Sequence, residues 1–150
     1  MNCIGDGSYL DLDPSKYHAS ERIVQKLKKF CDETNTKIVI SSNWRKFKDN
    51  DFWPFKSLKF FNPLPKLREQ LKGYIVDDLP HIRHTTKAEA MILWFEETDF
   101  KGNFVIFDDD LREKFHTTHD YHISEHFVLT DIEKGLTDGN IEQAKKILGK

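Results

Sequence analysis

Apolar positions along this chain follow two patterns, one typical of amphipathic helices and the other typical of buried strands. In the first pattern apolar residues return every three or four positions, as they do from Ile23 to Cys31, with Ser20 placed to cap the segment. Thr86 and Glu89 form a capping-box pattern at the start of another such segment. The pattern predicts four helices, over residues 20–34, 64–71, 86–98 and 140–148.

The second pattern consists of short apolar runs between these helices. It predicts buried strands over residues 37–41, 74–76, 104–107 and 127–129. Strands that alternate with helices indicate an α/β fold with a mainly parallel sheet. Residues 1–18 are polar and contain Gly and Pro, so they are predicted to form a loop or flap and no core strand.

Composition narrows this picture only slightly. A chain of 150 residues with 38% hydrophobic and 32% charged residues fits one globular domain over residues 1–150. A net charge of −2 gives no reason to expect a broad basic surface for nucleic acid or membrane. The apolar runs are too short to span a membrane and the first residues do not resemble a signal peptide, so a cytoplasmic protein is expected. Cys31 falls on the predicted apolar helix face and is expected to be a buried thiol.

Candidate chemistry begins where the third predicted strand ends. Asp108, Asp109 and Asp110 follow the apolar run 104–107 directly. Adjacent carboxylates repel one another, and a hard cation such as Mg²⁺, which takes one or two carboxylates, would relieve that repulsion. The alternative is a solvated acidic turn.

Two further polar groups occur at comparable positions. Ser41 ends the predicted strand 37–41, and Lys87 lies in the first turn of the helix 86–98. A cation at that position opposes the helix dipole, which indicates an anionic partner, although an ordinary surface lysine is the alternative. In chain order Ser41, Lys87 and the Asp108–Asp109 pair suit phosphoryl transfer. A hydroxyl can hold phosphoryl oxygens, a lysine can offset their charge, and carboxylates can position Mg²⁺.

These residues resemble the motifs of the haloacid dehalogenase-like (HAD) phosphohydrolase superfamily. The second motif of that family is matched by residues 38–41, the third by Lys87, and the fourth by residues 104–109. The stretches 37–45, 104–110 and 128–131, with 135–137, look more closely like the small HAD domains of RNA-repair proteins. The resemblance runs from about residue 9 to the end of the chain.

The resemblance implies a three-layer Rossmann-like sandwich with a mainly parallel sheet and no large cap domain. It also implies a Mg²⁺-dependent phosphohydrolase acting on a phosphate monoester such as an RNA or DNA end. Ser41 and Lys87 would then be catalytic, and Asp109 would be the direct metal ligand with Asp108 supporting it. Substrate binding would fall to three residues after the second motif: Ser42, Asn43 and Arg45.

The first motif of the family, a buried strand ending Asp-x-Asp, is where the chain departs from the resemblance. Asp11 and Asp13 have the right spacing, but residues 1–10 are no buried strand. The better alignment makes residues 1–18 the flap, so we expect this chain to lack the nucleophile and a central strand, as a shortened product or a pseudo-enzyme would. Asp11 as nucleophile with Asp13 as acid/base is the less favoured alternative. A receiver domain of the response-regulator type is excluded, because its acidic pair comes first in the chain.

Two other stretches leave alternatives open. Residues 44–61 interleave aromatic and basic side chains, which suits single-stranded nucleic acid. For any one of these rings, packing in the core under a long loop is the favoured interpretation. His116, His119, His122 and His126 have a spacing that could serve zinc, but a solvated loop is the favoured interpretation. Two functions therefore remain: the phosphohydrolase, and a non-catalytic module that binds phosphate or nucleic acid.

Overall fold

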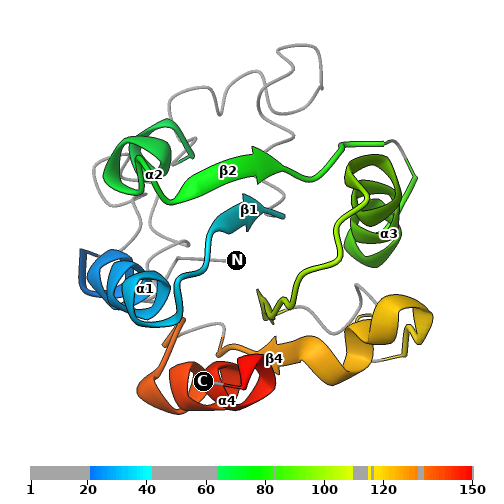
Figure 1. Ribbon diagram of the computed structural model, residues 1–150. Helices are drawn as coiled ribbons and strands as arrows, with labels where there is room; N and C mark the ends of the chain where they lie inside the picture. Colours follow the sequence, from blue (N-terminus) through cyan, green and yellow to red (C-terminus); the bar gives the residue numbers. More distant parts are fainter. Residues whose placement is uncertain are drawn as a thin grey trace.

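A computed structural model describes residues 21–41, 64–82, 84–109, 115, 117–131 and 134–149 (Figure 1). The elements in chain order are α1 (Glu21–Thr34), β1 (Ile38–Ile40), α2 (Leu64–Gln70), β2 (Ile75–Asp78), α3 (Lys87–Thr98), β3 (Ile106–Asp108), the 3₁₀ helix η6 (Asp120–His126), β4 (Phe127–Leu129) and α4 (Asp138–Leu148). The predicted alternation of strands and helices is confirmed, and so is the α/β class.

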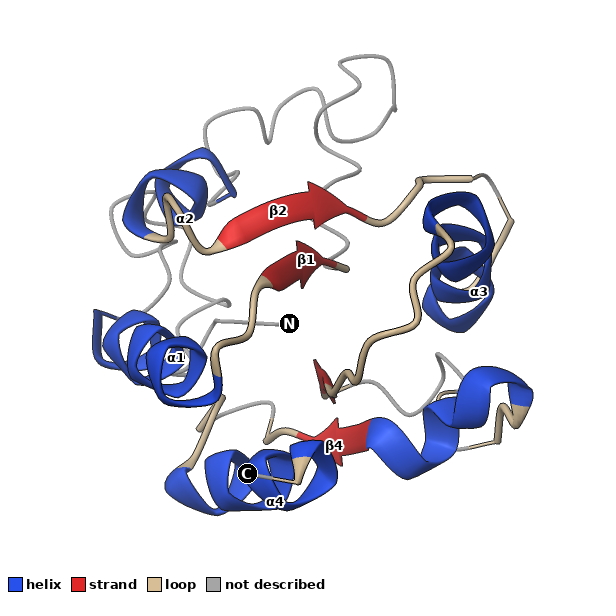
Figure 2. Ribbon diagram, in the orientation of Figure 1, coloured by secondary structure: helices blue, strands red, loops and turns tan. Residues whose placement is uncertain are grey.

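The four strands form two separate parallel pairs. β1 pairs with β2, and β3 pairs with β4, with Ile106 opposite Phe127 and Asp108 opposite Leu129. Figure 2 shows the strands in the interior with the helices arranged around them. Within the described residues no ladder joins β1 to β3, so the expected single sheet is present only as two halves.

The helices form where the apolar pattern predicts them. α1 buries Ile23, Val24, Leu27, Phe30 and Cys31, the face identified from the sequence. Thr86 caps α3 through a capping box with Glu89, as expected. α4 begins two residues earlier than predicted because Thr137 forms a second capping box, with Asn140.

The core divides into two clusters, and each of them draws on both strand pairs. One contains residues of α1, β1, α2, β4 and α4, among them Leu67 and Val128. The other contains Phe95 of α3 and Ile106 of β3, and Val39 of β1 packs against it. The two strand pairs are therefore connected through both clusters.

Strand bounds and one loop differ from the sequence expectations. β2 extends to Asp78. β3 covers residues 106–108 in place of 104–107, because β4 offers only three residues for it to pair with. Residues 120–126, expected as a solvated loop, form η6 with positive φ at Tyr121 and His122. Among the described helices none is long and apolar enough to cross a membrane.

Candidate functional site

The most deeply buried charges in the described part of the chain belong to one ion pair. Lys87 Nζ lies 2.7 Å from Asp108 Oδ2, and the two side chains are 3% and 0% exposed. Lys87 is the first residue of α3, held there by the Thr86 capping box, and Asp108 is the last residue of β3. A buried charge is costly unless it is paired, and the helix dipole also disfavours a cation at this position. The contact with Asp108 offsets both costs, which explains why a lysine is tolerated here. The anionic partner inferred for Lys87 includes a residue of the chain itself.

The backbone of Asp108 is also held, through the pairing of β3 with β4. Its carbonyl accepts a hydrogen bond from Thr130 N at 2.9 Å, which continues the β3–β4 ladder. Asp109 follows at the strand end and is half-buried. Asp108 and Asp109 are thus neighbours at the end of β3, while Asp110 lies outside the described residues.

Asp108 and Asp109 offer two carboxylates that could hold Mg²⁺. No group of three or more His, Cys, Asp or Glu side chains that could hold a metal occurs in the described part. Mg²⁺ needs only one or two carboxylates and keeps several waters, so Asp109 with Asp108 would be enough. A cation there would share Asp108 with Lys87, because Asp108 Oδ2 already contacts the ammonium group. Asp109 as direct ligand remains a prediction.

Ser41 follows β1 and is 7% exposed. Leu79, which follows β2, donates its backbone N–H to Ile40 O at 2.9 Å. The ends of β1 and β2 therefore lie side by side. The chain after Leu79 leads to Lys87, whereas Asp108 belongs to the other sheet. That Ser41 and Asp108 share one active-site edge remains a prediction.

Several predicted site residues lie outside the described residues. They are Asp11, Asp13, Ser42, Asn43, Arg45, His116 and the aromatic and basic side chains of residues 44–61. Of the other histidines, His119 and His122 are exposed, as expected for a solvated segment. The expectation is wrong for His126, whose Nδ1 lies 2.7 Å from Phe104 O and whose ring stacks on Phe104 at 4.2 Å.

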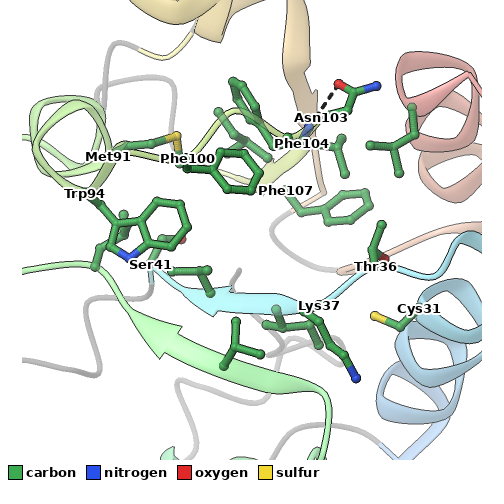
Figure 3. A pocket seen from close by; sticks show the side chains of 18 of the residues that line it. Cys31, Thr36, Lys37, Ser41, Met91, Trp94, Phe100, Asn103, Phe104 and Phe107 are labelled. Carbon is green, nitrogen blue, oxygen red and sulfur yellow. Dashed lines mark hydrogen bonds between the residues drawn. The ribbon is translucent and has the colours of Figure 1, made fainter. Parts of the chain in front are cut away.

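A cavity of about 380 Å³ lies between β1 and residues 102–107 and was not foreseen from the sequence. Figure 3 shows Trp94 and Met91 reaching toward it from α3, and Cys31 lying on the α1 side. Cys31 is buried, as predicted, and burial raises the pKa of its thiol. No sequence signal could have found the cavity, because it depends on how the two half-sheets are spaced.

Comparison with known families matches residues 6–141 to the family described as "HAD domain in Swiss Army Knife RNA repair proteins". The chain belongs to this family. The match confirms the resemblance drawn from the motifs at Ser41, Lys87 and Asp108, and membership indicates a Rossmann-like α/β domain of HAD phosphohydrolase type connected with RNA repair. No curated protein and no solved structure matches the chain significantly.

Proposed function

We propose that this HAD domain is a Mg²⁺-dependent phosphohydrolase that acts on a phosphate monoester at the end of a nucleic acid. The buried Lys87–Asp108 pair at the carboxyl end of β3 carries the proposal, because sheets of this class bind ligands at the carboxyl ends of their strands. Replacing a buried ion pair with apolar side chains of similar size often leaves the stability of a fold unchanged or raises it, so stability alone does not account for this pair. Their position beside Asp109 favours a functional role.

Each residue has a distinct task in this proposal. Lys87 offsets the negative charge of the phosphoryl group, and Asp108 holds the ammonium group in place. The Ser41 hydroxyl donates to a phosphoryl oxygen. Asp109 and Asp108 would hold Mg²⁺, which when bound would neutralise charge on the phosphoryl oxygens.

The finer fold belongs to the same proposal. In a single three-layer sandwich over residues 1–150, β1–β2 and β3–β4 would be two parts of one mainly parallel sheet. Ser42, Asn43 and Arg45 would contact the substrate. Residues 44–61 would guide a single strand toward the site by base stacking.

Turnover of 4-nitrophenyl phosphate and of 5′- and 3′-phosphorylated oligonucleotides by the full chain, with and without Mg²⁺, tests the proposal. Asp109→Asn should abolish turnover and weaken Mg²⁺ binding measured by calorimetry. Glu97→Gln, an exposed acid on α3, is the matched control and should leave both unchanged. Equal losses from both variants would show that the effect is general electrostatics.

A module that binds phosphate or nucleic acid without turnover is the second candidate. The sequence of residues 1–18 contains no long apolar run that ends Asp-x-Asp, and this favours the second candidate. The second candidate predicts no turnover and an oligonucleotide affinity that falls as salt rises. Turnover that Asp11→Asn abolishes would make Asp11 the nucleophile and overturn the flap assignment.

A further inference from the structure

The end of β4 carries a polar residue that the proposed phosphohydrolase does not use. Residues 128–131 belong to the stretches that resemble RNA-repair HAD domains, and none of them has a role so far. Thr130, which follows β4 directly, is only 6% exposed. Its backbone N–H donates to Asp108 O at 2.9 Å. Thr130 therefore lies at the end of β3, where the candidate metal ligands are.

The register of the two strands brings Thr130 next to Asp109. β3 and β4 are parallel, and Leu129 lies opposite Asp108. The next residue along each chain is Thr130 after β4 and Asp109 after β3. Neighbouring strands lie roughly 4.8 Å apart, so a short side chain on one can reach the residue opposite it on the other. Thr130 is therefore the neighbour, across the strand pair, of the carboxylate proposed as the direct metal ligand.

Thr130 and Asp109 are also expected on the same face of the strand pair. Phe107 and Val128 lie opposite each other, and both pack in the core cluster that contains residues of α1 and α4. Side chains alternate along a strand, so residues two positions further on return to the same face. Asp108 is on the other face, where its carboxylate contacts α3. The two adjacent carboxylates thus face different surroundings, and Thr130 is placed to serve Asp109.

The turn after β4 holds the backbone on both sides of Thr130. Leu129 O accepts from Asn140 Nδ2 at 3.1 Å, and Asp131 O accepts from Gly135 N at 2.8 Å. Gly135 has a φ of +65°, a left-handed conformation that glycine adopts without strain. The position of Thr130 is therefore supported by the fold itself, as precise placement of a functional side chain requires.

Packing alone does not call for a hydroxyl at this position. A valine would have nearly the same shape beside Val128 and would bring no polar group into the interior, where an unpaired hydroxyl is costly. Within the part of the chain that the structure describes, no hydrogen bond engages the Thr130 hydroxyl. A threonine hydroxyl can both donate and accept, so this group has the capacity to serve a bound ligand.

We propose that Thr130 is a positioning residue of the candidate metal site, whose hydroxyl donates to the Asp109 carboxylate when Mg²⁺ is bound. Carboxylates that hold a metal are themselves hydrogen-bonded by outer partners, which orient them and strengthen binding. A hydrogen bond to one carboxylate oxygen leaves the other for the cation. This inference rests on the proposed function and adds to it a residue that sets the affinity for the metal.

Calorimetric titration of the full chain with Mg²⁺ gives the first readout. Thr130→Val removes the hydroxyl and keeps the shape, and it should weaken Mg²⁺ binding about tenfold or more. Thr130→Ser keeps the hydroxyl, and its affinity should stay within about twofold of the unmodified chain. Thr98→Val is the matched control, because it removes an exposed hydroxyl that donates to Trp94 O at the end of α3, and it should leave Mg²⁺ binding unchanged.

The Mg²⁺ dependence of turnover gives the second readout. In Thr130→Val the half-saturating Mg²⁺ concentration should rise about tenfold or more, while kcat at saturating Mg²⁺ should recover to near that of the unmodified chain. The urea midpoint of this variant should not fall, because valine suits the apolar surroundings. If Thr130→Val does not fold, Thr130→Ala takes its place with the same expected loss of affinity.

Two results would overturn the proposal while leaving the phosphohydrolase in place. One is Mg²⁺ binding by Thr130→Val that is as tight as that of the unmodified chain. The other is a loss in Thr130→Ser as large as in Thr130→Val, which would mean that the methyl group and its packing matter and the hydroxyl does not. An unmodified chain that binds no Mg²⁺ would instead overturn the proposed function, and this inference with it.

Discussion

Replacing Lys87 with Met should destabilise the fold strongly, because Asp108 would remain as a buried carboxylate without its ammonium partner. The pair is 3% and 0% exposed, and removing one member of such a pair costs about 3–5 kcal/mol. That is a large share of the roughly 5–15 kcal/mol that holds a domain folded. At an m value of about 2 kcal/mol/M, the urea midpoint should fall by about 2 M.

Urea unfolding followed by tryptophan fluorescence measures this effect. Lys101→Met is the matched control, since Lys101 pairs with Asp99 at 2.7 Å while both side chains are almost fully exposed, and little change is expected. Lys87→Met combined with Asp108→Leu should recover most of the loss, because no unpaired charge then remains buried. A midpoint shift in Lys87→Met as small as that of Lys101→Met, or a double variant as unstable as the sum of its parts, would refute the reasoning.

Three smaller effects follow from the same structure. Because burial raises its pKa, Cys31 in a Cys3→Ser chain should react with a thiol reagent at pH 8 more slowly than a free cysteine, and should speed up in urea; an equal rate in both conditions would contradict this. Thr86→Ala should cost about 1 kcal/mol of stability in urea unfolding through loss of the α3 cap, and an unchanged midpoint would show that the cap is dispensable. The hydrogen bond from Lys145 lowers the pKa of Glu33, so this contact stabilises the fold above the ordinary Glu value of 4.5 and is lost as pH falls through the lowered value. Lys145→Ala should move the Glu33 pKa back up in an NMR titration, and an unmoved titration would exclude the contact in solution.

The helices could be predicted from the sequence because their signals are local. The apolar spacing from Ile23 to Cys31 and the Thr86–Glu89 capping box lie within a few residues of one another, and both appear in the structure as predicted. Strand bounds were less accurate. β3 takes in Asp108 and leaves out Phe104 because its length depends on β4, which lies some twenty residues later in the chain.

Lys87 and Asp108 were both singled out from the sequence, but their contact was not predicted. The mismatch between Lys87 and the helix dipole correctly indicated an anion, but nothing local identified Asp108 as the carboxylate that pairs with it. His126 was expected in a solvated loop, but its ring stacks on Phe104. Its spacing from the other histidines carried no information about that contact.

By itself, the sequence determined the α/β class, the helices and the family motifs, because periodicity, capping and strand-end chemistry are encoded within short stretches. Only the tertiary structure decided that Lys87 and Asp108 meet in the interior and that β1 and β3 border an apolar cavity. Both depend on contacts between residues far apart in the chain, where packing and backbone pairing, and no local preference, set the arrangement.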